Sequence, residues 1–214
     1  MQKANGCEIT PLTHIDNVLA VVLAGGKSTR MGRDKASLLL EGATLLERAV
    51  TTTRLALGVN SRIVVSGDRP GFECIPDQVA GLGPIGAINS VVKWAVDQTG
   101  FIGVLIVPVD MPLLTPASLR YLTDRGLKEN VSTQFENFEL PAYFRISTAL
   151  CQALEQLCSP NTVPSSRSLR ALLKTLAAIA APLLNSQTEF INTNTAAQFK
   201  LAVNIRVTEK KGSR

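Results

Sequence analysis

The chain has 214 residues, of which 45% are hydrophobic and 5% aromatic, and its formal net charge at pH 7 is +5. This length and apolar content allow one full hydrophobic core, whereas two large domains are not expected. The small charge excess and the few aromatic residues give no support to a nucleic-acid partner. No apolar run reaches the roughly 18 to 20 residues that span a bilayer, so we expect a cytoplasmic protein with no membrane partner.

Apolar runs that end at turn residues alternate with helical patterns along the chain, which is typical of an α/β fold. We predict a Rossmann-like three-layer αβα domain with a largely parallel sheet over residues 18–203. A mobile leader, residues 1–17, is expected before it and a basic tail, residues 204–214, after it. The elements expected in the first half are strands at 18–24, 62–66, 73–76 and 101–109, a helix that contains Leu45 and a helix with Pro84 in its first turn.

The second half of the chain continues the alternation of helices and strands. The elements expected there are a helix from Thr115, one or two strands in "STQFENFELPAYFR", helices near 148–157 and 168–178, a loop at 159–166, a short strand at 189–192 and a closing helix from Thr195. The cysteines form no C-x-x-C pair and His14 is the single histidine, so we expect reduced buried thiols and neither a zinc site nor a disulfide framework. These cysteines are Cys7, Cys74, Cys151 and Cys158.

The stretch "VLAGGKSTRMGRDK" directly follows the first predicted strand. Its Gly26-Lys27-Ser28 matches the end of a P-loop, but the first glycine of that pattern would fall on Val21, inside the strand. The P-loop is therefore excluded. The stretch is a glycine-rich turn, and it lies where open α/β sheets place their ligands, beyond the carboxyl end of a strand.

Four cations within nine residues of this turn indicate an anionic ligand: Lys27, Arg30, Arg33 and Lys35. Gly25 and Gly26 let backbone groups approach a base or phosphates closely. Arg30 offers a forked donor for phosphate oxygens, and Lys35 offers a compact charge that can follow a moving phosphoryl group. From charge alone, a solvated basic loop remains an alternative.

A second glycine cluster, "GLGPIG", has the G-x-G-x-x-G spacing of dinucleotide-binding folds at Gly81, Gly83 and Gly86. That fingerprint needs its first glycine at the end of a strand, whereas "DQVA" separates Gly81 from the predicted strand at 73–76. A nicotinamide or flavin site is therefore only weakly indicated.

The stretch "LAGGKSTRMGRDK" resembles the signature L-A-G-G-x-S-x-R-M-G-x-D-K of the molybdenum cofactor guanylyltransferases, which belong to the nucleotidyltransferase superfamily. Gly25 favours the guanylyl branch, because molybdopterin cytidylyltransferases usually begin this stretch with Leu-Ala-Ala-Gly. Asp34 favours it too, because the related sugar-nucleotide and cytidyl-erythritol enzymes usually have proline before the lysine. The stretches "IPDQVAGLGPIGAI", "VPVDMPLL" and "INTNT" resemble further family elements in the family's order. The resemblance covers residues 18–199.

The resemblance implies a role for each matching residue. It assigns the phosphates to Lys35, the nucleoside end to Asp77 and Mg²⁺ to Asp110, with Arg30, Lys35 and Asp110 as the catalytic group. The implied nucleotide site consists of Leu23, Ala24, Gly25, Gly26, Lys35, Ser66, Asp77, Gly83, Pro84 and Asp110. Asn192 and Asn194 would lie near the pterin-side substrate. Residues 167–170 could reach the phosphate of that substrate. The chain departs from the family enzyme at Ser66, where that enzyme has asparagine, and at Leu140, where it has histidine.

The reaction implied is attack by the terminal phosphate of molybdopterin on the α-phosphorus of GTP, with release of pyrophosphate. Because this nucleophile is already anionic, no general base is needed, and catalysis consists of positioning and charge neutralisation. The expected partners are GTP, molybdopterin or molybdenum cofactor, and, transiently, other cofactor-synthesis proteins. From the residues alone, Asp110 could equally be a cap and Asp77 a turn residue.

Three alternatives remain open at this point. The enzyme could transfer CMP to the same pterin, or a nucleotide to another phosphorylated acceptor. A non-catalytic nucleotide sensor on the same fold is also conceivable, since fold does not settle function. The sensor is less favoured, because it would need the base contacts but not Arg30, Lys35 and Asp110 together.

Overall fold

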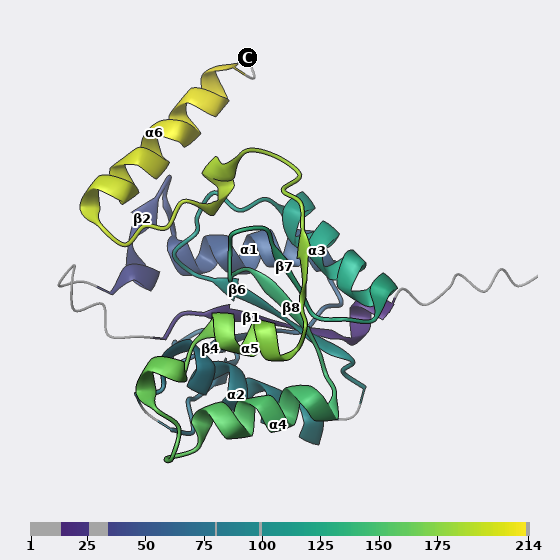
Figure 1. Cartoon of the computed structure of the whole chain (residues 1–214). Helices are drawn as coiled ribbons and strands as arrows, with labels where there is room; N and C mark the ends of the chain where they lie inside the picture. Colours follow the sequence, from purple (N-terminus) through teal and green to yellow (C-terminus); the bar gives the residue numbers. More distant parts are fainter. Residues whose placement is uncertain (1–13, 26–33, 80, 99, 213–214) are drawn as a thin grey trace, which may run out of the picture.

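A seven-stranded sheet forms the centre of the molecule (Figure 1). The computed structural model describes residues 14–25, 34–79, 81–98 and 100–212. In sheet order the strands are β5 (Cys74–Ile75), β4 (Ile63–Ser66), β1 (Val18–Leu23), β6 (Gly103–Pro108), β8 (Ala142–Arg145), β7 (Thr133–Phe135) and β9 (Ile179–Ala181). All run in one direction except β8, which is antiparallel to both of its neighbours. The predicted α/β fold with a largely parallel sheet is confirmed.

Helices cover both faces of the sheet and make the three layers (Figure 1). One face carries α1 (Leu45–Leu57) and α3 (Pro116–Glu129), and the other carries α2 (Gly83–Asp97), α4 (Thr148–Cys158) and α5 (Leu169–Thr175). Most of these helices begin where the sequence provides a hydroxyl cap that accepts a backbone N–H of the first turn. The caps are Thr44, Thr115, Ser147 and Ser168. The short 3₁₀ turns are η1 (His14–Asn17), η2 (Lys35–Ser37), η3 (Pro164–Ser166) and η4 (Gln187–Phe190).

Strand β1 separates two hydrophobic cores. Its side chains alternate, so that Val18, Ala20 and Val22 belong to the core under α1 and α3, whereas Leu19 and Val21 belong to the core under α2 and α4. These five side chains are all fully buried. A strand that is buried on both faces in this way reads as a continuous apolar run, which is why it could be recognised in the sequence.

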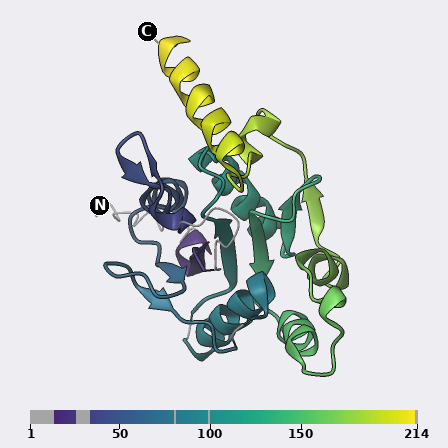
Figure 2. The same ribbon diagram turned by 90° about the vertical axis from the view of Figure 1, so that its left-hand side faces the viewer.

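A small hairpin and the closing helix lie beside the main sheet. The hairpin consists of β2 (Leu39–Leu40) and β3 (Ala43–Thr44), a pair that we did not predict from the sequence. Helix α6 (Ala196–Gly212) extends away from the sheet (Figure 2). In the hairpin turn, Oε2 of Glu41 lies 3.4 Å from Nη1 of Arg48 in α1 and 3.8 Å from Nε of Arg206 in α6. Glu41 therefore links the hairpin to both helices.

The prediction of a strand at residues 189–192 is wrong. That segment begins with the end of η4, whose first turn Ser186 caps by accepting the backbone N–H of Thr188. The sheet edge is formed instead by β9, in the register Thr133↔Ile179 to Phe135↔Ala181. Both segments are short and partly apolar, and pairing with β7, a contact remote in sequence, decides between them.

Several boundaries differ from the sequence-based expectations. The helix expected at 168–178 is α5, which is shorter because Ala177 adopts a left-handed φ of 48° before the chain enters β9. Residues 204–212, expected as a basic tail, continue α6. Residues 1–13 of the expected leader, which include Cys7, lie outside the described residues.

The three described cysteines are free thiols and are only partly buried. In the described part of the chain, no helix has both the length and the apolar character needed to cross a membrane.

Two glycines make room for the largest buried side chain. Tyr143 of β8 is 1% exposed, and burial raises the pKa of its phenol to about 12, so it is neutral at physiological pH. A Cβ atom at Gly103 of β6 or at Gly126 of α3 would overlap the Tyr143 ring. These two positions therefore require glycine for packing.

We expect Gly126→Ala to lower the free energy of unfolding by about 1–3 kcal/mol, because the added methyl overpacks against Tyr143. The effect opposes helix propensity, which favours alanine over glycine by about 1 kcal/mol. Urea denaturation of the variant and parent measures it. As a control, Lys128→Ala removes an exposed side chain of the same helix and should change stability by less than about 0.5 kcal/mol. A stabilised Gly126→Ala protein would contradict the packing argument.

Candidate active site

The carboxyl ends of β1 and β6 lie side by side and define the candidate site. Leu23 is the register partner of Pro108, and the backbone N–H of Val109 donates to the carbonyl of Leu23 at 3.3 Å. The chain leaves β1 toward Gly25 and leaves β6 toward Asp110. Both therefore start from the same edge of the sheet, where open α/β folds bind ligands.

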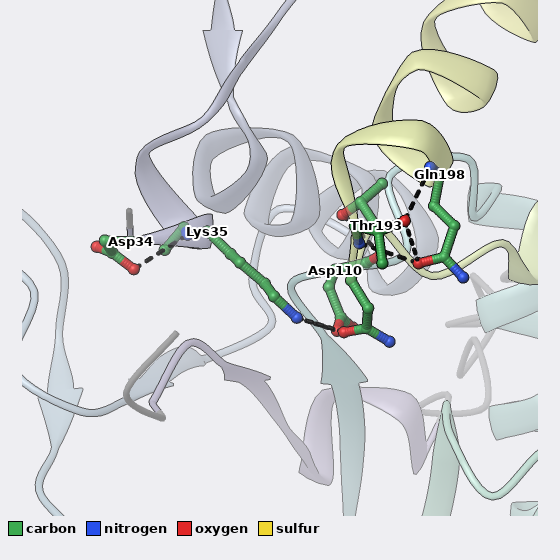
Figure 3. A network of polar contacts seen from close by, with 8 residues as sticks. Asp34, Lys35, Asp110, Thr193 and Gln198 are labelled. Carbon is green, nitrogen blue, oxygen red and sulfur yellow. Dashed lines mark hydrogen bonds and ion pairs between the residues drawn. The ribbon is translucent and has the colours of Figure 1, made fainter. Parts of the chain in front are cut away.

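Three polar residues from distant parts of the chain converge at this edge. Nζ of Lys35 lies 3.4 Å from Oδ2 of Asp110, and it also donates a hydrogen bond to Oδ1 of Asn194. The Lys35 and Asp110 side chains are 20% and 23% exposed, so the ion pair is partly shielded from water. Figure 3 shows Lys35 extended from η2 toward Asp110. The sequence analysis singled out all three residues, and the fold brings them together.

The backbone of Asp110 holds Asn194 in place. The backbone N–H and the hydroxyl of Thr193 both donate to the carbonyl of Asp110, at 2.8 and 3.1 Å, and Thr193 is fully buried (Figure 3). On the other side, Thr195 and Gln198 cap α6 reciprocally, each accepting the other's backbone N–H with its side chain. Asn194 therefore lies between two fixed points, which aims its side chain at Lys35.

A buried carboxylate anchors the segment that leads to Thr193. Glu189 is 7% exposed and accepts hydrogen bonds from the hydroxyls of Thr115 and Ser118, at 3.1 and 2.7 Å, and from the amide of Asn185 at 2.6 Å. The first two donors stand at the start of α3, directly after the Asp110 segment. Sequence reasoning missed this role, because a lone glutamate before an asparagine motif carries no signal of burial.

A second cluster lies beside the first, at the ends of β4 and β5. The hydroxyl of Ser66, which is fully buried, donates to Oδ1 of the exposed Asp77 at 3.1 Å. A Cβ atom at Gly25 would lie 3.6 Å from the Ser66 carbonyl and 4.0 Å from Oδ2 of Asp77. Gly25, Ser66 and Asp77 thus form one neighbourhood, although 52 positions separate the first from the last in the sequence.

Other expected site residues have different placements. Gly83 and Pro84 are exposed at the start of α2, and Asn192 is partly buried two positions before Asn194. Gly26 and Arg30 lie outside the described residues. In the "GLGPIG" stretch, a Cβ at Gly86 would come within 2.7 Å of Cβ of Leu82, so helix packing explains that glycine without a dinucleotide.

Arg69 is a site residue that sequence reasoning missed. Its guanidinium donates to the backbone carbonyl of Ala24 at 2.6 Å. It also forms a bidentate ion pair with Asp34, in which Nη2 lies 3.0 Å from Oδ1. Asp34 also caps η2 by accepting the backbone N–H of Ala36. Nothing in the local pattern "GDRP" indicates that this arginine reaches two segments so far from it in sequence.

The oxygen atoms at the site fit a metal ion that is shared with a ligand. Among the described residues, no group of three or more His, Cys, Asp or Glu could hold a metal by itself. Asp110 and Asn194 place a carboxylate and an amide oxygen on the same lysine nitrogen. Mg²⁺ usually takes one or two carboxylates and completes its coordination with phosphate and water, so the donor set suits a phosphate-bound Mg²⁺.

Comparison with known proteins gives one consistent result. The family model described as "MobA-like NTP transferase domain" matches residues 20–180. A molybdenum cofactor guanylyltransferase of Xanthomonas euvesicatoria pv. vesicatoria is 41% identical over 180 residues, which cover 84% of this chain and 90% of the relative. A molybdenum cofactor guanylyltransferase of Rhizobium meliloti is 40% identical over 106 residues, or 47% of this chain and 48% of the relative.

Solved structures show the same fold at lower identity. Molybdopterin-guanine dinucleotide biosynthesis protein A from Archaeoglobus fulgidus superposes with a TM-score of 0.70 at 21% identity, over 89% of this chain and 99% of that one. The 2-C-methyl-D-erythritol 4-phosphate cytidylyltransferase of Thermus thermophilus superposes with a TM-score of 0.61 at 15% identity, over 87% and 97% of the two chains.

We expect Glu189→Gln to lower the free energy of unfolding by about 1–3 kcal/mol, because the amide nitrogen of glutamine cannot accept the hydrogen bonds that one of the carboxylate oxygens accepts from Thr115, Ser118 or Asn185. Chemical denaturation measures the change. Glu155→Gln on the exposed face of α4 is the control and should leave stability within about 0.5 kcal/mol of the parent. If the two variants were equally stable, the buried contacts of Glu189 would not anchor the segment.

Proposed function

The chain belongs to the MobA-like NTP transferase family, and we propose that within this family it is a molybdenum cofactor guanylyltransferase. The enzyme transfers GMP from GTP to the terminal phosphate of molybdopterin and releases pyrophosphate. The relative from Xanthomonas, which is 41% identical over most of both chains, supports the choice within the family. The observation that carries the proposal is the convergence of Lys35, Asp110 and Asn194 at the edge of β1 and β6.

The nucleoside of GTP is assigned to the cluster around Gly25. The backbone of Leu23, Ala24 and Gly25 would contact the guanine nucleotide, and the exposed carboxylate of Asp77 would accept hydrogen bonds from its nucleoside end. Ser66 supports Asp77 through its 3.1 Å hydrogen bond, so its role in this proposal is to orient that carboxylate. Gly83 and Pro84, exposed at the start of α2, and Gly26 belong to the proposed nucleotide site as well.

The phosphates are assigned to the neighbouring cluster. Lys35 would contact the phosphates of GTP and stabilise the negative charge that develops as pyrophosphate leaves. Arg30 would add a second cation. Because the attacking phosphate of molybdopterin is already anionic, the protein has no proton to remove, and it acts by positioning the two anions against each other. This matches a site whose described groups are a lysine, a carboxylate and an amide.

Asp110 would hold a divalent cation, which we propose is Mg²⁺. When bound, this ion would neutralise phosphate charge that Lys35 and Arg30 do not reach. Asn194 accepts a hydrogen bond from Lys35, and following the family resemblance we assign it and Asn192 to the pterin-side substrate. Arg167 and Arg170 stay candidates for the pterin phosphate. At present Arg167 donates to the Ser159 carbonyl and Arg170 pairs with Glu139.

Transfer of CMP and transfer to another acceptor are the runner-up reactions, and neither is favoured by the Xanthomonas relative, which matches most of the chain. A nucleotide sensor is not favoured either, since Lys35 and Asp110 lie together at the phosphate end. Action in the cytoplasm and transient contact with other cofactor-synthesis proteins remain predictions of the sequence.

We expect the purified protein with Mg²⁺ and molybdopterin to use GTP about 10²-fold or more better than CTP or ATP. A site built to pair with one base leaves buried polar groups unpaired with another. Mass spectrometry of the turnover products identifies the nucleotide transferred. Equal use of CTP would overturn the guanylyl assignment and leave the fold untouched.

Gly25→Ala should fold normally, because its Cβ would meet Ser66 at an ordinary contact distance of 3.6 Å, but should bind GTP more weakly.

We expect Asp110→Asn to abolish turnover even at raised Mg²⁺, because the site would lose its carboxylate ligand. Asp77→Asn should mainly weaken GTP binding. A Mg²⁺ titration at saturating GTP, with a direct measurement of GTP affinity, separates the two. Asp124→Asn, a change of an exposed carboxylate on α3, is the control for general charge effects. A normally active Asp110→Asn enzyme, or an Asp77→Asn defect that extra Mg²⁺ cures, would show that the two roles are exchanged.

A further inference from the structure

We propose that Arg69 is a positioning residue that sets the nucleoside half of the site against the phosphate half. This inference rests on the proposed function, which defines the two halves. One half begins at Ala24 and Gly25, and the other begins at Asp34 and Lys35. Arg69 is the side chain that contacts both Ala24 and Asp34.

The contacts of Arg69 use the whole guanidinium fork. Both terminal nitrogens reach the Asp34 carboxylate, and Nη2 also donates to the Ala24 carbonyl at 2.6 Å. The pair is partly shielded, with the Arg69 side chain 23% exposed and that of Asp34 39% exposed. A planar fork makes such simultaneous contacts with fixed geometry, whereas a lysine ammonium is a single point on a flexible stem.

The backbone that carries Arg69 is itself fixed close to Gly25. Gly67 has a φ of 108°, and a Cβ atom there would lie 3.5 Å from Cα of Gly25, so the chain after β4 passes directly over the end of β1. The Arg69 carbonyl accepts hydrogen bonds from the backbone N–H of Phe72 and the thiol of Cys74, at 3.2 and 3.3 Å. The arginine therefore projects from a closed turn rather than a free loop.

Asp34 passes this constraint to Lys35. The carboxylate that Arg69 holds also accepts the Ala36 N–H at 3.2 Å and caps η2, whose first residue is Lys35. Moving Asp34 would move the start of η2 and hence Nζ of Lys35 relative to Asp110. Since misplacement by about 1 Å can cost about 10²-fold in rate, Arg69 affects turnover without touching a reacting atom.

The competing explanation is an ordinary surface ion pair, which contributes little to stability and needs no special geometry. The two explanations differ for Arg69→Lys, which keeps the charge but cannot make all the contacts. We expect Arg69→Lys to melt close to the parent temperature and to lose about 10- to 100-fold in kcat for GMP transfer. Asp34→Asn, which keeps a capping oxygen but weakens the ion pair, should behave alike.

The matched control is Arg62→Ala, which breaks an ion pair of similar type between Arg62 and Glu73, both more than 40% exposed, at the other end of β4. Its turnover should stay within about twofold of the parent, as expected for an exposed pair. Hydrogen exchange on the protein without substrates gives a readout that does not depend on the reaction. Arg69→Lys should exchange faster at the backbone amide of Ala36, and Arg62→Ala should not.

The outcomes separate this inference from the proposed function. If the parent does not convert GTP and molybdopterin, the proposed function fails, while exchange at Ala36 still tests whether Arg69 fixes η2. If Arg69→Lys turns over like the parent, or if exchange at Ala36 is unchanged, the positioning role is overturned. Should Arg69→Lys melt far below the parent and recover full turnover at low temperature, the contact is structural only, and the inference is likewise overturned.

Discussion

The pairing of β1 with β6 is the constraint on which the other features of this molecule depend. Six residues of each strand are in parallel register, from Val18↔Gly103 to Leu23↔Pro108, at the centre of the sheet. Nearly all of their side chains are buried, and successive residues lie in opposite cores, so a one-residue shift of register would move each side chain into the wrong core and disrupt the packing of both. Because parallel strands end at the same edge, this register alone brings the segment after Leu23 next to Asp110.

Asp110 converts that edge into a site by using two of its groups in different ways. Its backbone carbonyl takes both donors of Thr193, and its carboxylate faces Lys35. The first contact attaches the carboxyl-terminal segment, and the second attaches the segment after the glycine-rich turn. The ammonium of Lys35 and the carboxylate of Asp110 are both partly exposed. This exposure limits the cost of desolvating the two charges and leaves Lys35 accessible to an anionic ligand. The buried Glu189 holds the segment that leads to Thr193 against the start of α3. Its hydrogen bond from Ser118 is buried, so water does not compete for it.

The substrates of a guanylyltransferase are both anions, and this explains the chemical character of the site. Bringing a phosphate nucleophile to a triphosphate costs free energy through charge repulsion, and in the reaction that we propose the cation of Lys35 would reduce that cost. The nucleoside cluster at Gly25, Ser66 and Asp77 lies at the neighbouring strand ends. The proposed sites of nucleotide recognition and of phosphoryl transfer therefore occupy adjacent strand ends of one sheet, and Arg69 is a side chain that we propose couples them.

The sequence by itself determined the elements whose signal is local. Buried central strands read as apolar runs, helical patterns indicated the helices that begin after Thr115 and Ser168, and the stretch from Leu23 to Lys35 indicated the family. Only the tertiary structure decided which weak segment completes the sheet edge, since β9 and residues 189–192 are alike until one of them pairs with β7. It also decided the partners of Arg69 and Glu189, because a polar side chain is specified by the donors and acceptors around it. Asp34 lies 35 positions from Arg69, and Ser118 lies 71 positions from Glu189. No local sequence pattern can indicate partners at such separations.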